Sequence, residues 1–359
     1  MAQIMYNLPY VFCQTFILII SDLSGMYDWV KDYVQTEDMS AYTGVPTKAA
    51  AIIGSAAATY LSLEYFSGGK CTSSASMKGK TCLITGCNTG IGKETARDLS
   101  RRGAKVIMAC RNLDLAEKAA EDIRKTSEGE IVVKKLDLAN LASIHAFAQE
   151  FNITEERLDV LINNAGVMWI PQKTHTADGF ESTIGVNHLG HFLLTNLLLD
   201  KLRASKPARI VNVSSRAHTR GQMDLNDINF ATKPWNPMTA YEQSKLANVL
   251  FSRQLVKMLN PNEVCVYSLH PGVVRTDLGR HIEDKIGVFR YVLWGLLWPF
   301  TKNPVQGAQT TIHCAVSEEL EGETGLYYSD CSPQEAAPLA QNDETAEKLW
   351  ELSSKLVGM

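Results

Sequence analysis

The sequence lacks an excess of charge of either sign, and it lacks cysteines spaced as metal ligands. Its 359 residues include 35 lysines and arginines against 39 aspartates and glutamates. No strongly basic face of the kind that binds nucleic acid is indicated, so nucleic acid is not an expected partner. The eight cysteines show no paired framework. This pattern is typical of an intracellular protein with reduced thiols.

Long apolar runs are also scarce. The run at 8–20 is too short to span a bilayer comfortably. Residues 49–66 are rich in alanine and carry no charge before Glu64. They could form a weak membrane helix, an interfacial anchor, the apolar part of a targeting segment or an ordinary core helix. We favour a membrane role, because residues 66–80 behind them have the composition of a flexible tether.

From Lys80 onward, short apolar strands alternate with helices, and no repeat of solenoid type is found. The alternation predicts an α/β fold, a Rossmann-type doubly wound parallel sheet of about seven strands in a single domain. We expect an N-terminal leader at 1–79, the sheet domain at 80–335 and a C-terminal helical tail at 336–359. The expected strands lie near 81–85, 105–110, 131–138, 158–166, 208–215, 264–272 and 325–330.

A glycine-rich turn, TGCNTGIG at 85–92, lies between the first expected strand and the first helix. Gly86 permits a tight turn, Gly90 lets the backbone approach a pyrophosphate, and Gly92 lets the helix pack close to the strand. The helix N-terminus then offers free N–H groups to phosphates. Turns are often rich in glycine, but this position in a parallel sheet predicts a dinucleotide site.

The end of the second strand bears on which dinucleotide is bound. An NAD site usually has an acidic residue there, but here the residue is Arg111, and the first acid is Asp114. A guanidinium suits a 2′-phosphate, so NADP(H) is favoured; otherwise Arg111 is an ordinary solvated charge. Asp137, after the third strand, could contact adenine or cap the segment that follows.

Tyr241 and Lys245 are one turn apart on an expected helix over about 239–258. A phenol with an ordinary pKa near ~10 works poorly as an acid or base near neutral pH. A lysine on the same helix face would lower that pKa by favouring the phenolate. Such pairs also occur by chance, so the surrounding motifs must decide.

Six motifs occur in order and at suitable intervals, and together they resemble the short-chain dehydrogenase/reductase superfamily over roughly 78–330. Within it, the segments around 187–202, 240–251 and 270–281 are similar to the retinol dehydrogenase group. The six motifs are TGCNTGIG (85–92), NNAG (163–166), VNHLGHF (186–192), IVNVSS (210–215), YEQSK (241–245) and HPGVVRT (270–276).

The resemblance implies four catalytic residues. Tyr241 is the general acid/base, and Lys245 lowers its pKa and bonds the nicotinamide ribose. Ser215, rather than Ser214, holds the substrate oxygen, and Asn187 completes a proton relay through water to the lysine. The implied NADP(H) site comprises Gly86, Cys87, Asn88, Thr89, Gly90, Ile91, Gly92, Arg111, Asp137, Leu138, Asn164, Ala165, Gly166, Tyr241, Lys245, Pro271, Gly272, Val274 and Thr276.

The segment 286–300 is apolar, aromatic and flanked by basic residues. The resemblance implies that this segment is the substrate lid. Its composition suits a lipid-like substrate and contact with a membrane surface, although a core-packing helix is the alternative. The resemblance implies an NADP(H)-dependent enzyme that interconverts retinal and retinol, with reduction of all-trans-retinal favoured. The alternatives are the same chemistry on another lipid or steroid carbonyl, or a non-catalytic cofactor-binding sensor. The intact Ser215, Tyr241 and Lys245 argue against a sensor.

Residues 1–38 match no part of the resemblance, and Met39 begins a segment of about the expected leader length. Our hypothesis is that 1–38 is an alternative or misassigned N-terminus, which mass spectrometry of the native amino terminus would test. The resemblance implies a membrane-associated enzyme, with the mitochondrial inner membrane favoured over the endoplasmic reticulum. A homo-oligomer stays open.

Overall fold

The structure is a computed structural model, and it describes residues 64, 66–275 and 301–359. Residues 69–275 and 302–359 belong to one unit, here called the sheet unit. The described residues 64, 66–68 and 301 belong to a second unit. Thr276 and the segments 1–38 and 286–300 lie outside the described residues, as does 49–66 apart from residues 64 and 66.

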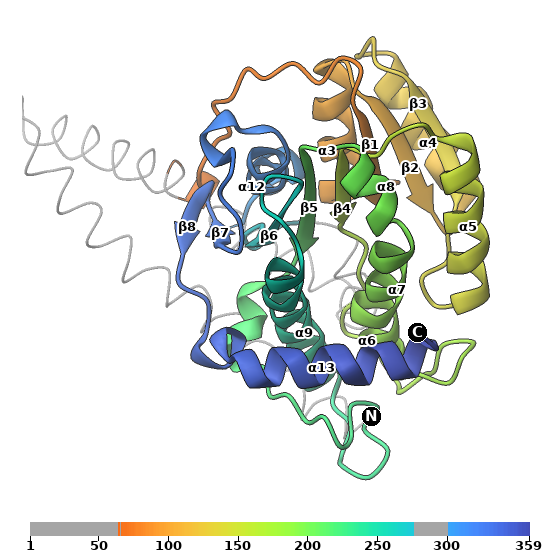
Figure 1. Ribbon diagram of the computed structural model, residues 1–359, viewed down its shortest axis with the longest axis vertical. Coiled ribbons are helices and arrows are strands. Elements are labelled where there is room, and N and C mark those ends of the chain that lie inside the picture. Colours follow the sequence, from red (N-terminus) through yellow and green to blue (C-terminus); the bar gives the residue numbers. More distant parts are fainter. Residues whose placement is uncertain (1–63, 65, 276–300) are drawn as a thin grey trace, which may run out of the picture. The chain divides into compact units, whose positions relative to one another are not determined.

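The sheet unit contains one eight-stranded sheet among its described residues, in the order β3-β2-β1-β4-β5-β6-β7-β8 (Figure 1). Neighbouring strands are parallel except for β7 and β8. The predicted doubly wound α/β fold is confirmed, with one more strand than expected. The strands are β1 (Thr81–Thr85), β2 (Lys105–Cys110), β3 (Ile131–Lys135), β4 (Val160–Asn163), β5 (Ala208–Val213), β6 (Val264–His270), β7 (Tyr327–Ser329) and β8 (Ser332–Gln334).

The described helices connect these strands. The expected helical stretch over 178–203 begins at Ser182 and is divided, with a π-helical turn in its first half. The α-helices are α3 (Gly90–Arg101), α4 (Leu113–Arg124), α5 (Leu141–Thr154), α6 (Ser182–Ile184), α7 (Gly190–Leu197), α8 (Leu199–Ala204), α9 (Pro237–Met258), α12 (Pro304–Val316) and α13 (Asp343–Val357). The π-helix is η2 (Gly185–Leu189), and the 3₁₀-helices are η3 (Arg216–Arg220), η6 (Glu318–Leu320) and η7 (Pro338–Gln341).

Alternating side chains of each strand pack into different cores on the two faces of the sheet. On β1, Cys82 and Ile84 pack with α3, α4 and α12, whereas Leu83 packs with α5, α7 and α9. This follows from the two-residue period of a strand, and it explains why β1 is buried along its whole length. The strand order reverses between β1 and β4, and in such sheets ligands bind beyond the carboxyl ends of the strands at this point.

Residues 70–79 differ from the expected tether, because the chain is held against the sheet unit. The Met77 side chain is 7 % exposed and belongs to the core between the sheet and α3. Arg102 donates hydrogen bonds to the backbone oxygens of Ser73 and Ala75. A sequence of small polar residues indicates flexibility, but it cannot reveal these backbone contacts.

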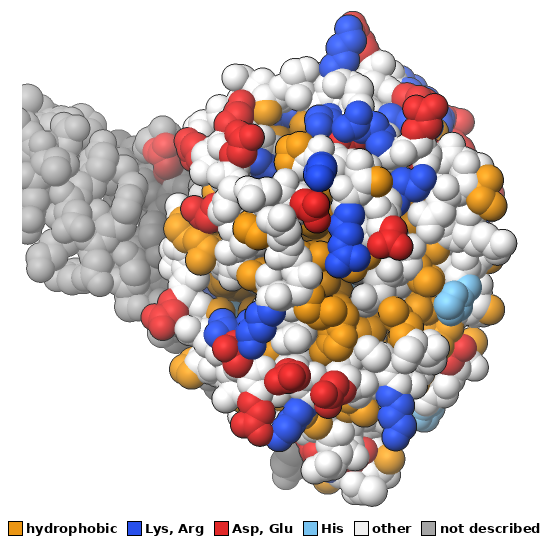
Figure 2. All heavy atoms as spheres, viewed as in Figure 1, with side chains coloured by type: hydrophobic (Ala, Val, Ile, Leu, Met, Phe, Trp, Pro, Cys, Tyr) orange, Lys and Arg blue, Asp and Glu red, His pale blue; other side chains and the backbone are white. Residues whose placement is uncertain are grey.

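Charged side chains of both signs are interspersed over the face shown in Figure 2. Lys348 pairs with Glu344 along α13, and Arg253 of α9 pairs with Asp343. Within the described part of the chain, no helix is long and apolar enough to cross a membrane.

Candidate active site

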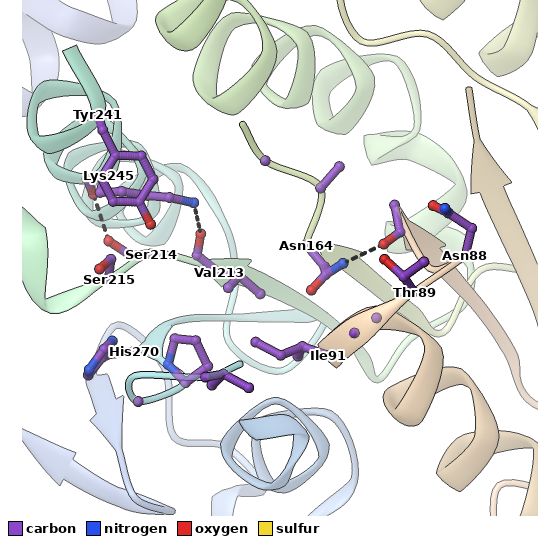
Figure 3. A pocket seen from close by; sticks show the side chains of 18 residues that line it. Asn88, Thr89, Ile91, Asn164, Val213, Ser214, Ser215, Tyr241, Lys245 and His270 are labelled. Atoms are coloured by element: carbon purple, nitrogen blue, oxygen red, sulfur yellow. Dashed lines mark hydrogen bonds between the residues drawn. The ribbon is translucent and has the colours of Figure 1, made fainter. Parts of the chain in front are cut away.

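A cavity of about 230 Å³ lies at the carboxyl ends of β1, β4, β5 and β6. Figure 3 shows residues of the glycine-rich turn on one side of this cavity, and Tyr241 and Lys245 of α9 on the opposite side. The residues that line it are Gly86, Asn88, Thr89, Gly90, Ile91, Gly92, Asn164, Ala165, Gly166, Val213, Ser214, Ser215, Tyr241, Lys245, His270, Pro271, Gly272 and Val274.

The glycine-rich turn interlocks with the turn that follows β4. Gly86 has a φ of +64°, and a Cβ there would lie 2.7 Å from the Cβ of Ala165. A Cβ on Gly92 would lie 2.5 Å from the Asn164 amide nitrogen. No larger residue fits either position without moving backbone, so the sequence requirement for glycine has a direct steric cause.

Asn164 and Thr85 fix the relative position of these two turns. The Asn164 amide donates to the backbone oxygens of Thr85 and Gly86 at 2.8 and 3.1 Å. The Thr85 hydroxyl oxygen in turn accepts from the backbone N–H groups of Asn164 and Ala165, both at 3.0 Å. The floor of the cavity is therefore built from paired backbone groups.

The N-terminus of α3 faces this cavity and suits a phosphate. Thr89 is the N-cap residue, and its side chain makes no capping hydrogen bond within the described structure. The first-turn N–H groups of a helix need such a partner, and an anion can supply it. Because Gly90 and Gly92 leave room for close approach, the residues present fit a dinucleotide pyrophosphate.

Tyr241, Ser215 and Lys245 meet on the other side of the cavity. α9 begins at Pro237 after the N-cap Asn236, which places Tyr241 and Lys245 one turn apart. Tyr241 is 6 % exposed, and it lines the cavity together with Ser215. The Lys245 ammonium lies 5.6 Å from the centre of the Tyr241 ring.

The electrostatics of this pair differ from the sequence-based expectation. Burial raises the pKa of Tyr241 to about 12, although the Ser215 side chain acts to lower it. Burial also lowers the pKa of Lys245 to about 8. The Lys245 ammonium donates to the backbone oxygen of Val213 at 3.0 Å.

The structure distinguishes the two serines at the end of β5. The Ser214 hydroxyl donates to the backbone oxygen of Lys245 at 2.7 Å and so anchors α9 to the strand. The Ser215 hydroxyl lies in the cavity lining with Tyr241 and accepts from the backbone N–H of Ala217 at 3.1 Å. Only Ser215 is thus placed to share a substrate oxygen with the phenol, as the motif implies.

Asn187 lies in the π-helical turn η2 behind the cavity. Its side-chain oxygen accepts from the Val167 backbone N–H at 2.8 Å, and its amide donates to the Val167 oxygen and the Ser244 hydroxyl. A Cβ on Gly166 would lie within 3.6 Å of both the Asn187 oxygen and the Lys245 nitrogen. Asn187 and Lys245 therefore flank the same glycine, and π-helical turns are frequent at functional sites.

Four further described residues of the predicted site, Cys87, Arg111, Asp137 and Leu138, are not among those that line the cavity. Cys87 is buried behind the glycine-rich turn, and Arg111 is exposed after β2. The Asp137 carboxylate accepts from the Ala139 backbone N–H, whereas Asn140 is the N-cap residue of α5. Leu138 is buried in the core under α5 and α7.

Three lining residues, Val213, Ser214 and His270, are absent from the sequence-based set. Val213 contributes through its backbone oxygen, which no side-chain pattern reports. The signal for His270 is its position just before Pro271, at the carboxyl end of β6. His270 is 8 % exposed, and its Nδ1 has no hydrogen-bond partner among the described residues.

A family model described as short chain dehydrogenase matches residues 80–287. The chain belongs to this family. Human "Retinol dehydrogenase 12" is 50% identical over 297 residues, which cover 82% of this chain and 92% of that protein. Human "Retinol dehydrogenase 13" is 49% identical over 306 residues, covering 85% and 92% of the two chains. The two identities are too close to favour either relative.

Solved structures of similar proteins share the fold. A crystal structure of an uncharacterised protein from Mycobacterium paratuberculosis matches with a TM-score of 0.65 and 35% identity, covering 81% of this chain and 98% of that one. The RhlG/NADP active-site complex of Pseudomonas aeruginosa matches with a TM-score of 0.56 and 26% identity, covering 70% and 94%. As a family member, the chain is an oxidoreductase of the type that uses a nicotinamide dinucleotide.

Proposed function

We propose that this protein is an NADP(H)-dependent oxidoreductase that interconverts retinal and retinol, acting mainly in the direction of retinal reduction. The observation that carries the proposal is that Tyr241 and Ser215 line one cavity together with the glycine-rich turn. A carbonyl oxygen placed between the two hydroxyl groups would accept a hydrogen bond from each.

In the reductive direction, the Tyr241 phenol would be the proton donor. Because burial raises the pKa of Tyr241 to about 12, the phenol keeps its proton near neutral pH. It can therefore donate that proton to the developing alkoxide, while Ser215 holds the same oxygen in place. When bound, the nicotinamide supplies the hydride. The Lys245 ammonium stabilises the phenolate that the transfer leaves behind.

The preference for NADP(H) rests on Arg111. Arg111 is exposed directly after β2, the strand next to β1 and its glycine-rich turn. Asp114, the nearest acid, lies in the first turn of α4, where a negative charge stabilises the helix N-terminus. Asp114 thus has a structural role, which leaves Arg111 to meet a ribose 2′-phosphate.

The substrate class is drawn from relatives whose names state that they are retinol dehydrogenases. A lid formed by 286–300, membrane association through 49–66, a mitochondrial inner-membrane location and the domain limits 1–79, 80–335 and 336–359 remain part of the proposal. Fractionation of cells that express the full chain would test the location against the endoplasmic reticulum.

The direct test is oxidation of NADPH by the purified full chain in detergent with all-trans-retinal, with a steroid ketone in parallel. We expect turnover with retinal and a loss of at least ~100-fold in Tyr241→Phe, because the variant cannot donate the proton. The variant should still bind NADPH. Turnover only with the steroid would move the proposal to another lipid carbonyl. Full activity in Tyr241→Phe would contradict it.

The cofactor preference has its own test. Arg111→Gln should raise the KM for NADPH by about tenfold or more and leave the KM for NADH nearly unchanged, since only NADPH carries the 2′-phosphate. Lys118→Gln, which removes a positive charge from exposed α4, is the matched control. An equal change in the KM for NADPH and for NADH would show that Arg111 does not bind the 2′-phosphate.

A further inference from the structure

Two cysteines meet directly behind the proposed cofactor loop. Cys87 belongs to the glycine-rich turn, and Cys110 ends β2 immediately before Arg111. Their sulfur atoms are 3.8 Å apart, and the two side chains are 0 % and 2 % exposed. Both sulfurs are present as free thiols. A disulfide bond is about 2.05 Å long, so a small movement of one loop would bring the two sulfurs to bonding distance.

The backbone holds these thiols in register. Gly86 donates a hydrogen bond from its N–H to the backbone oxygen of Ala109 at 2.9 Å, which joins the turn to the end of β2. The Cys87 sulfur also contacts the backbone oxygen of Ile84 at 3.2 Å. Because both chain segments are fixed on either side of the pair, the two sulfurs face each other with little freedom to separate.

The surroundings assign different chemical roles to the two thiols. The Cys87 thiol lowers the pKa of Cys110 against the effect of burial, and backbone N–H groups of the turn act in the same direction. Burial raises the pKa of Cys87. Cys110 is therefore the better nucleophile, and Cys87 is placed to act second.

We propose that Cys87 and Cys110 form a reversible disulfide in response to a peroxide, and that this modification weakens dinucleotide binding. The Cys110 thiolate attacks hydrogen peroxide, so that an S–O bond forms, the O–O bond breaks and the first water leaves after protonation. Cys87 then loses its proton and attacks the Cys110 sulfur, so that the S–S bond forms and the S–O bond breaks. The leaving hydroxide takes up a proton and departs as the second water. Two thiols are oxidised by two electrons, and one peroxide is reduced to two waters.

The glycine-rich turn lies between the two thiols and the cavity. It therefore affects both the access of peroxide to the thiols and the shape of the cavity after cross-linking. Gly86 and Asn88, the neighbours of Cys87, both line the cavity and neither cysteine does, so a peroxide that enters from the cavity must pass the glycine-rich turn. A Cβ on Gly92 would lie 2.9 Å from the Cα of Cys87. Drawing Cys87 toward Cys110 therefore disturbs the packing of the turn against the N-terminus of α3, where a pyrophosphate would bind.

The test treats the full chain with hydrogen peroxide and follows two readouts. Intact mass should fall by two hydrogens, and peptide mapping should find Cys87 joined to Cys110. The dissociation constant for NADPH should rise about tenfold and recover with dithiothreitol. Cys110→Ala, which lies outside the implied cofactor site, should bind NADPH normally and become insensitive to peroxide. Cys87→Ala should likewise form no cross-link when it is treated with peroxide. Cys265→Ala, which removes another buried thiol, should respond as the unmodified chain does.

The outcomes separate this inference from the proposed function on which it rests. Both thiols remaining open to alkylation after unfolding of the peroxide-treated protein, or a cross-link that leaves NADPH affinity unchanged, would overturn the inference. Failure of the reduced protein to bind NADPH would instead overturn the proposed function, because the cross-link is measured by mass without any cofactor.

Discussion

Lys245 is a positively charged side chain that is buried beside Tyr241 in the folded protein. It is 3 % exposed, and burial lowers its pKa from 10.5 to about 8. Below about pH 8, the Lys245 side chain is charged in the folded protein, and burying this charge lowers the free energy of unfolding. Its acceptor, the Val213 backbone oxygen, also receives a hydrogen bond from Asn248, so it would not be left unpaired without the lysine.

Lys245→Met should therefore lose turnover and gain stability. At pH 7 we expect the free energy of unfolding in urea to rise by about 1–3 kcal/mol, because a buried charge is replaced by an apolar side chain of similar size. The gain should shrink between about pH 8 and pH 10, where the folded wild-type lysine loses its proton but the unfolded one keeps it. A gain that grows with pH would contradict the assigned pKa direction.

The sequence predicts which side chains take part in the chemistry, but it does not predict the properties that depend on burial and distance. The motifs predict Ser215, Tyr241 and the glycine-rich turn, and the structure brings these residues together in one cavity. The raised phenol pKa could not be read from the Tyr–Lys spacing, because spacing does not report burial or the Val213 oxygen that engages the ammonium.

At the scale of elements, Tyr241 lies close to the N-terminus of α9. Asn236 caps the helix by accepting hydrogen bonds from the N–H groups of Met238 and Thr239. Tyr241 lies only five residues beyond this cap. Fraying of the first turn would therefore reach the catalytic hydroxyl before it reaches Lys245, which packs deeper in the helix.

Asn236→Ala should lower the free energy of unfolding by about 1 kcal/mol and also lower kcat for retinal several-fold. Asn342→Ala removes the N-cap of α13, which accepts from the Thr345 N–H at 2.8 Å, and so serves as a matched control. We expect the control to lose similar stability in urea titrations but to keep its kcat. Equal kcat losses would show that cap strength acts only through global stability.

Elements were predictable where they follow a strong pattern. The seven parallel strands were expected from their apolar runs, and the structure confirms them. β8 was not, because Ser332–Gln334 is exposed, contains Pro333 and pairs only at the sheet edge. The division of the helix after residue 181 was also hidden, since its apolar residues continue through the π-helical turn.

At the scale of the whole sheet unit, the last helix completes the core near the active site. α13 crosses α9 in Figure 1. Trp350 packs against Phe192 of α7 and Phe251 of α9, with ring centres 4.8 and 5.9 Å apart. Ser353 is hydrogen-bonded to His188 of η2, the neighbour of Asn187. The tail expected at 336–359 is thus joined to the π-helical turn, a contact between distant segments that no local pattern could predict.

Trp350→Ala should consequently destabilise the protein by about 2–4 kcal/mol, because it opens a cavity between three helices. Ile153→Ala is the control, since Ile153 on α5 is 77 % exposed and should change the free energy of unfolding by less than about 0.5 kcal/mol. Urea unfolding followed by circular dichroism measures both. If α13 only covers the core from outside, the two variants should behave alike. If α13 completes the core, Trp350→Ala alone should lose stability, and with it the alignment of η2 behind Lys245.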